Sequence, residues 1–307
     1  MKKIIIILIT VASSMNVLAQ DHFTTLRVLI PQTHEVAAYV GGGFSPIGNK
    51  FKKEFMDGSK FSGKIGGDLV GLSYTYLAAE RAQRRMQIGF NTGLGLGLYR
   101  STTTITSGRI SIGILTDDES HNFRLHTSIA DYEERQNAMF LQIPLMMQAN
   151  FRDQYYVRAG VKAAIPISSR FKSSNVLITN EAEYFEIGPI LPDARFKGIG
   201  TFEKSPSGKI DFGFTVMASI EAGVKLHVSE TFKLYVGAYF DFGLVNSMKS
   251  TEKTFLDYDP LANYDYDPPL PAKPKHFGVN SVLTEFSERS RMWSVGLTVR
   301  ANLWTNY

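Results

Sequence analysis

Hydrophobic residues occupy every second position over long stretches of this chain. The clearest stretch is Phe212–Val228, in which apolar residues alternate with a set that includes Glu221, Lys225 and His227. Successive side chains of a β-strand point to opposite faces, so a period of two predicts a strand with one apolar and one polar face. The stretch exceeds the ~5–6 residues of an ordinary strand. It is long enough for a tilted membrane strand, which crosses lipid in ~9–11 residues.

Seven further segments show the same alternation, two of them more weakly. The weaker two are 36–45 and 65–79, and the others are 86–98, 139–152, 155–168, 232–244 and 291–307. Eight strands are an even number that allows a sheet to close on itself, so that no edge amide lacks a partner in lipid. The pattern predicts an all-β, closed, antiparallel up-and-down transmembrane β-barrel that begins at residue 36 and turns its apolar face to lipid.

The connections between these strands alternate between short and long. Short turns are predicted at Glu80–Arg84, around Asp153 and at Ser229–Glu230. Long polar connections are predicted at about 46–63, 101–137, 169–209 and 249–290. Outer-membrane barrels have short periplasmic turns and long extracellular loops, so the alternation indicates both the location and the orientation of the chain.

Ten strands are an alternative, in which 111–115 and 123–129 form an additional transmembrane pair. We favour eight, because Asp117, Asp118 and Glu119 and the nearby threonines make a poor lipid-facing surface. Aromatic residues near the strand ends are expected to form interfacial girdles. The predicted girdles contain Tyr76, Phe151, Tyr155, Phe232, Trp304 and Tyr307 on the short-turn side, and Phe171, Phe212 and Trp293 on the loop side.

The N-terminus has the features of a secretory signal peptide. Lys2 and Lys3 precede an apolar run, and Val17–Ala19 approximates a small-residue cleavage motif. We therefore expect residues 1–19 to be removed, which leaves 20–35 as a periplasmic segment. An uncleaved anchor helix is the alternative, but the apolar run is short and polar residues interrupt it.

Composition excludes several kinds of protein. The chain has no Cys, so disulfides, thiolate catalysis and a lipid-bearing cysteine are excluded. Its formal charge of +4 arises from 33 basic and 29 acidic residues, a balance that does not indicate a nucleic-acid partner. No apolar stretch of ~18 residues follows the leader, so no membrane helix is expected there.

Three segments resemble a known family. Phe140–Leu145 resembles the "LEIPLLL" strand of the outer-membrane β-barrel ("porin family") proteins typical of Bacteroidetes-type envelopes, and Tyr155–Lys162 resembles the strand that follows it. Phe240–Asn246 resembles the family's "YxxGLxN" segment, and the aromatic C-terminus looks like the signal for the barrel-assembly machinery. The resemblance implies an eight-stranded outer-membrane barrel. It implies no specific function, because the family includes secretion and gliding accessories and many members without an assigned role.

Charged residues on the predicted inner face are the first candidates for a functional site. They are Arg85, Arg158, Lys162, Glu221, Lys225, Asp241 and Arg300. They could form an ion path, but an eight-stranded barrel has just enough interior for its own side chains. We therefore favour a salt-bridge network that plugs the lumen, with Glu221 as its hub. Basic residues outnumber acidic ones here, so some cations should find Tyr, amide, backbone or water partners.

The long loops hold the remaining candidates. His121 and His126 lie near Asp117–Glu119, but their spacing matches no catalytic motif, and we expect solvated loop residues. The doublet Asp257–Asp259 and Asp265–Asp267 fails the EF-hand template, and a Pro-rich segment follows it, so we expect a recognition loop instead of a calcium site. The possible anchors for a partner in that loop are Tyr258, Tyr264 and Tyr266. The glycine-rich segments 41–43 and 93–97 lie within strand patterns and are not phosphate loops.

These observations predict a structural or interaction component of the outer membrane, without catalytic residues, cofactor or bound metal. Its expected partners are outer-membrane lipid, the barrel-assembly machinery during insertion, and an envelope protein bound through the loops. A small-solute pore or an accessory of a secretion system is the alternative. A barrel enzyme would need a Ser, His or acidic group fixed at a rim, and a soluble carrier would point its apolar face inward.

Overall fold

The computed structural model of this chain is an antiparallel all-β structure. The residues it describes are 29–30, 32–51, 56–57, 60–81, 86–174, 176–186, 188, 190–191, 194–229, 232–249, 253–261 and 277–306. The predicted signal peptide, Arg85, Tyr264, Tyr266 and Tyr307 lie outside the described residues. Within these ranges, no helix is long and apolar enough to span a membrane.

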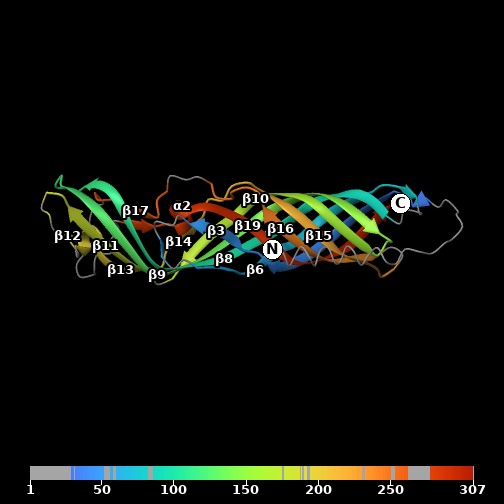
Figure 1. The fold of residues 1–307 in the computed structure, drawn as a ribbon, viewed down its shortest axis with the longest axis horizontal. Coiled ribbons are helices and arrows are strands. Elements are labelled where there is room, and N and C mark those ends of the chain that lie inside the picture. The colour runs from blue at the N-terminus through green and yellow to red at the C-terminus, as the bar shows by residue number, and fades with distance from the viewer. Residues whose placement is uncertain are drawn as a thin grey trace.

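Eight strands form a ring, each hydrogen-bonded to a neighbour on both sides (Figure 1). In ring order they are β2 (Thr33–Phe44), β6 (Ile65–Leu77), β8 (Met86–Thr116), β9 (Asn122–Phe151), β10 (Tyr155–Ser173), β15 (Thr215–His227), β16 (Lys233–Gly243) and β19 (Ser287–Asn306). The last strand pairs with the first, for example Val299 with Val40. This order follows the chain, as expected for an up-and-down arrangement. Two short strands, β1 (Leu29–Ile30) and β7 (Glu80–Arg81), pair with each other. In sequence β1 precedes β2 and β7 follows β6.

The ring turns its apolar side chains outward and its polar side chains inward. On β19, Leu297 is 65% exposed whereas the next residue, Thr298, is 4% exposed. Other outward residues with large exposed side chains are Val40, Leu72, Phe90, Leu94, Leu145, Met147, Val161, Ile165, Ile220, Val224, Phe240 and Val295. In a water-soluble protein these positions would be an extensive exposed apolar surface, so the outward face is suited to lipid.

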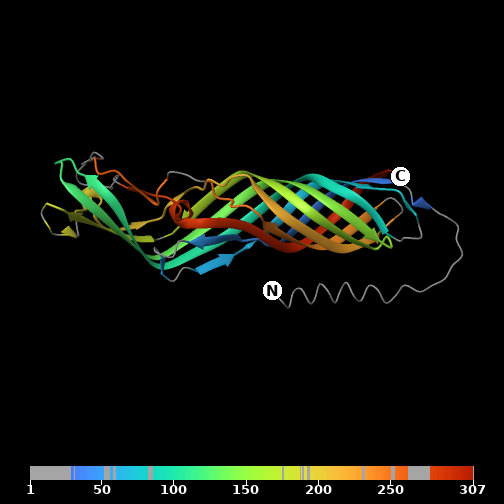
Figure 2. The same ribbon diagram turned by 45° about the horizontal axis from the view of Figure 1, so that its top comes forward.

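Strands β8 and β9 continue well beyond the other strands and form an elongated second part of the molecule (Figures 1 and 2). We call this part the extension: residues 101–116 of β8, residues 122–136 of β9 and the elements packed on them. On β9 lies β11 (Val176–Tyr184), which pairs in turn with β12 (Ile190–Leu191) and β13 (Gly200–Lys204). On β8 lie β4 (Met56–Asp57) and β5 (Lys60–Gly63).

Shorter elements join the extension to the ring. Strand β3 (Ile47–Phe51) pairs with β19, and β14 (Ser207–Lys209) pairs with β10. A two-stranded sheet of β17 (Leu256–Tyr258) and β18 (Phe277–Val279), the 3₁₀ helix η2 (Arg195–Lys197) and the short helix α2 (Val282–Phe286) complete it.

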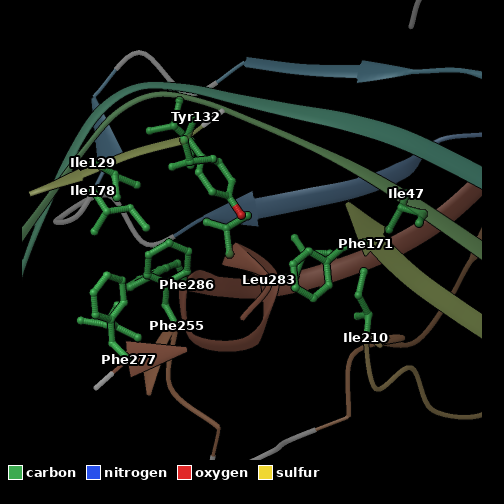
Figure 3. Close-up of a cluster of buried hydrophobic side chains, with 14 of the residues drawn as sticks. Ile47, Ile129, Tyr132, Phe171, Ile178, Ile210, Phe255, Phe277, Leu283 and Phe286 are labelled. Atoms are coloured by element: carbon green, nitrogen blue, oxygen red, sulfur yellow. The ribbon is translucent and has the colours of Figure 1, made fainter. Parts of the chain in front are cut away.

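The extension has a hydrophobic core of its own (Figure 3). Leu283 and Phe286 of α2 pack with Phe255 and with Tyr132 of β9, and Phe277 lies at the edge of the cluster. The buried positions of β9 are odd-numbered from Phe123 to Ile129 and even-numbered from Tyr132 onward. Between them Asp131 has a left-handed φ of 49°. The alternation of β9 therefore shifts by one residue at Asp131, so that odd-numbered residues are buried before it and even-numbered residues after it.

Several boundary predictions are corrected by these elements. The segments predicted as loops at 46–63, 101–137, 169–209 and 249–290 contain most of the short strands, and 111–115 and 123–129 are continuations of β8 and β9. The wall begins at Thr33 instead of residue 36, because β2 pairs with β6 from that residue. Phe171 and Phe212 do not belong to an outer girdle but are buried in the extension core. Trp304, predicted in the girdle on the short-turn side, is exposed, because a bulge of β19 between Asn302 and Trp304 turns it out of the alternation.

Candidate functional site

Buried charged side chains fill the inside of the ring, which we call the lumen. At its short-turn end, Lys225 bonds to Asp153 of the turn after β9. Lys233 Nζ lies 3.5 Å from Glu35 Oε1, and the Tyr235 hydroxyl donates to Glu35 Oε2 at 2.6 Å. These contacts link β2 to β16 across the inside of the ring and close this end with paired charges.

Glu221 occupies the next layer. Its carboxylate accepts a hydrogen bond from the Tyr156 hydroxyl at 2.6 Å and forms an ion pair with Arg158. Arg158 also donates from Nη1 to Asn91 Oδ1 at 2.8 Å. Both oxygens of Glu221 are thus used, and the layer connects β8, β10 and β15.

Lys162 forms the following layer with two carboxylates. Its ammonium bonds to Asp68 and lies 2.9 Å from Asp241 Oδ2. Ser294 donates to the same Asp241 oxygen at 3.1 Å, and the Lys162 ammonium lies 5.2 Å from the centre of the Tyr239 ring. One cation between two anions joins β6, β10 and β16 in the middle of the lumen.

The lumen is packed closely. A Cβ added to Gly95 would lie 1.8 Å from the hydroxyl oxygen of Tyr39, so only glycine lets that ring lie across the inside of the ring of strands. The phenol therefore occupies space that a larger side chain on β8 would need. Such close filling is the expected state of a small barrel.

Above the lumen, Glu134 fastens α2 to β9. Its carboxylate accepts hydrogen bonds from Tyr132 Oη at 2.5 Å and from Gln136 Nε2 at 2.8 Å. It also accepts from Ser281 Oγ at 2.6 Å and from the amide of Val282 at 3.0 Å. Burial raises the pKa of Glu134 above its ordinary value, although these four donors act in the opposite direction.

The far tip of the extension is organised around Asp117. Its Oδ1 accepts the amides of Glu119 and His121 at 3.0 and 2.9 Å, and its Oδ2 lies 3.4 Å from Lys197 Nζ. Burial alone would raise the pKa of Asp117. The His121 amide, the Lys197 charge and the Glu119 amide outweigh it and hold that pKa below its ordinary value.

A second polar chain crosses three strands of the extension. The Ser111 hydroxyl of β8 lies 2.8 Å from Nδ1 of His126 on β9, and His126 Nε2 lies 3.1 Å from Glu183 Oε2 on β11. Ser111 is exposed, so the arrangement opens to solvent. A nucleophile, a base and an orienting carboxylate in this order are the components of acyl-transfer chemistry.

Residues 19–249 match the family described as outer membrane protein beta-barrel domain. The chain belongs to this family. The resemblance found in its sequence is thereby confirmed, and the protein is an integral outer-membrane protein. No curated protein matches the chain.

Because the chain belongs to this outer-membrane family, the outward and inward faces of the ring can be assigned to lipid and to the lumen. The outward apolar residues face lipid, where only a ring of fully paired strands satisfies the backbone. Of the predicted lumen residues, Arg85 lies outside the described part of the chain. The structure brings all the others together on the inner side of the ring. These are Arg158, Lys162, Glu221, Lys225, Asp241 and Arg300, all buried.

Sequence reasoning missed Glu35, Asp68 and Lys233 as lumen residues. Asp68 is two residues before Val70, whose side chain faces outward. In a regular strand the two would share a face, so strict alternation predicts that Asp68 faces lipid. A bulge lies between Asp68 and Val70, and Gly67 before it has φ of 97°, which turns Asp68 inward. The sequence contains one sign of this bulge: Gly67 directly precedes an acidic residue at a position where the alternation calls for an apolar one. Glu35 was missed because the first strand was predicted to start at residue 36, three residues after its first residue, Thr33.

The loop candidates have different partners from those expected. His126 is not a solvated loop residue near Asp117, because it bonds to Ser111 and Glu183, which the sequence did not single out. The Tyr258 hydroxyl donates to the Lys197 carbonyl at 2.6 Å, and its ring packs edge-on against Phe123. Tyr258 is therefore a packing residue of the extension. Within the described residues, no cluster of three or more His, Asp or Glu side chains could hold a metal ion.

Proposed function

We propose that this protein is a closed, eight-stranded transmembrane barrel that holds a rigid extracellular extension, and that the extension binds another component of the envelope. The observation that carries the proposal is the core of the extension, in which α2, β9, β11 and β18 pack together. A connection that served only to join strands would need no such core. Loops held by a rigid scaffold are where binding sites concentrate.

The orientation follows from the connections. The described turn after β9 is short and lies at the end of the ring opposite the extension (Figures 1 and 2). Outer-membrane barrels have their short turns in the periplasm, so the extension would project from the cell. Export through a cleaved signal peptide and insertion by the barrel-assembly machinery are part of the same proposal.

An exposed patch on the extension has the composition of a binding surface. The Arg124 guanidinium lies 5.4 Å from the centre of the Phe185 ring, and Phe185 is exposed. Ile114 is the cross-strand partner of Arg124, and Ile190 that of Glu183. Both isoleucines are exposed. Aromatic and arginine side chains with an apolar surround are enriched at protein interfaces and carry much of their binding energy.

Site-specific cross-linking in intact cells tests this proposal. A photo-reactive amino acid at Ile190 should capture one discrete product, and the additional changes Arg124→Glu and Phe185→Ser should abolish it. The same amino acid at lipid-facing Leu297 is the matched control and should give no such product. Equal capture with and without the two changes would contradict a binding role for this patch.

A small-solute pore remains the competing function, because charged residues line the lumen. The ion pairs of Glu221 and Lys162 fill that lumen and favour a plug. Recording in planar bilayers distinguishes the two functions. We expect no defined conductance, and discrete single-channel steps from purified protein would establish the pore.

A hydrolase is a second candidate, favoured only by the chain Ser111–His126–Glu183. We regard binding as the better-supported function, because in the described structure these residues lie on an open strand surface. A fluorophosphonate probe tests the alternative. Labelling that is lost in Ser111→Ala and in His126→Gln, but kept in the neighbouring Ser128→Ala, would identify a catalytic serine.

A further inference from the structure

Arg300 is the most deeply buried cation of the lumen. Its side chain is 1% exposed, and among the described residues none of its three nitrogens has a hydrogen-bond partner. The guanidinium lies against two aromatic rings that also contact each other, 4.2 Å from the centre of Tyr235 and 5.3 Å from that of Tyr156. The rings offer a cation their faces, but a guanidinium carries five N–H donors that point away from a stacked ring.

Other donors of the same layer also lack partners. Among the described residues, Arg158 Nε is buried without one, and so is Asn150 Nδ2. Asn150 lies opposite Tyr156 in the pairing of β9 and β10, and Arg158 is two residues further along β10. The guanidinium groups of Arg158 and Arg300 both lie against the ring of Tyr156, 5.9 and 5.3 Å from its centre. This side of the lumen therefore has an excess of N–H donors.

The charges of the layer do not balance either. The carboxylate of this layer is Glu221, and its two oxygens are taken by Tyr156 and Arg158. Two guanidinium cations thus share one carboxylate. An uncompensated buried cation is costly in a protein interior, and stacking on aromatic rings offsets only part of that cost.

We propose that the lumen binds a small inorganic anion between Arg300 and Arg158, held by their unpaired N–H groups. The close filling of a small barrel restricts the ligand to the size of a halide such as chloride. The site supplies the missing negative charge of the layer and accepts hydrogen bonds that the protein leaves unmade. It does not depend on the binding function proposed for the extension.

Thermal unfolding of the detergent-folded protein tests the site. Chloride is titrated against gluconate at constant ionic strength, so that only the identity of the anion changes. The unfolding temperature should rise with chloride and reach a plateau. Arg300→Gln should remove the dependence, whereas Arg170→Gln, a change at an exposed arginine of β10, should keep it.

Crystals grown in bromide provide a second test that needs no variant. Anomalous scattering should place a bromide ion in contact with the guanidinium groups of Arg300 and Arg158. An unfolding temperature that is the same in chloride and gluconate, or a bromide map without density at this position, would overturn the proposal. Water molecules would then be the partners of these donors.

Discussion

The carboxylate of Glu134 on β9 accepts a hydrogen bond at 3.0 Å from the amide of Val282, the first residue of α2. The two residues are 148 positions apart in the chain. An orphan amide at a helix start needs an acceptor, and a buried carboxylate needs donors. Each group satisfies the other, and the contact fixes α2 within the hydrophobic core shown in Figure 3, of which Leu283 and Phe286 are members.

The change Glu134→Gln should loosen α2 while leaving the ring intact. The amide keeps one acceptor oxygen, but its NH₂ group cannot accept from the donors that face it, and each buried donor left unsatisfied costs about 1–3 kcal/mol. Hydrogen exchange at the amides of Val282–Phe286 should accelerate by at least tenfold. The exposed neighbour Glu133→Gln is the control and should leave these amides unchanged. Undiminished protection in Glu134→Gln would contradict the anchoring role.

The same carboxylate predicts a pH dependence of the extension. Burial raises the pKa of Glu134 in the folded state, so the folded protein holds this proton more tightly than the unfolded one. Its contribution to stability is therefore complete below the unfolded pKa of about 4.3 and is lost as the pH rises through the folded pKa. Protection of α2 amides should fall over that interval in the natural protein and stay level in Glu134→Gln.

Asp117 should have the opposite effect at the tip. Its pKa is held below the ordinary value by the amides of His121 and Glu119 and by Lys197. The stability it provides is present above the unfolded pKa of about 3.9 and is lost as the pH falls through the folded pKa. Exchange of the Glu119 and His121 amides should therefore rise in acid. Asp117→Asn should show fast exchange at every pH.

Removal of the Glu221 charge should destabilise the ring without preventing insertion. In Glu221→Gln, Arg158 loses its ion-pair partner in the lumen, and a broken buried pair costs about 3–5 kcal/mol. The unfolding temperature in detergent should fall by several degrees, while heat-modifiable migration in gels still reports a folded barrel. Glu203→Gln, on an exposed position of β13, is the control. An unchanged unfolding temperature would show that Glu221 is no hub.

Tyr39 and Gly95 should prove energetically coupled. The added methyl of Gly95→Ala collides with the Tyr39 hydroxyl, so the single change should lower the unfolding temperature. Tyr39→Phe removes the oxygen and should restore part of the loss in the double variant. Gly113→Ala, where an added Cβ meets nothing within 4 Å, should have little effect. Additive losses in the double variant would exclude the collision.

Much of the ring could be predicted from sequence, because lipid imposes a strict rule. Each membrane strand must alternate, so the facing of Leu297 and Thr298 follows from parity alone. The rule fails where the backbone departs from a period of two. The bulge at Asp68 reverses the facing of β6, and that at Asn302 turns Trp304 outward. Neither bulge can be detected from the alternation of apolar residues alone.

The extension could not be predicted in the same way. Its strands continue β8 and β9 past the lipid, where both faces may be polar or buried, and Asp131 changes the parity between two halves of one strand. Segments 176–204 and 255–286 show no long alternation in sequence. The apolar residues that the structure describes there, such as Ile178, Ile199 and Phe255, pack on several elements at once. The sequence pattern therefore predicts polar loops in these segments.

Sequence alone determined that this chain is an outer-membrane barrel, and it identified most of the charges inside. Alternation and charge are local properties of the sequence. Each residue of a membrane strand faces either lipid or the lumen, so its side can be inferred from its polarity and its position in the alternation. Only the tertiary structure decided which charges meet. It joined Glu134 to α2, placed Lys162 between two carboxylates, and left Arg300 without a hydrogen-bond partner among the described residues. Such contacts depend on the ring of strands, which brings residues from distant parts of the chain together and cannot be inferred from any single strand.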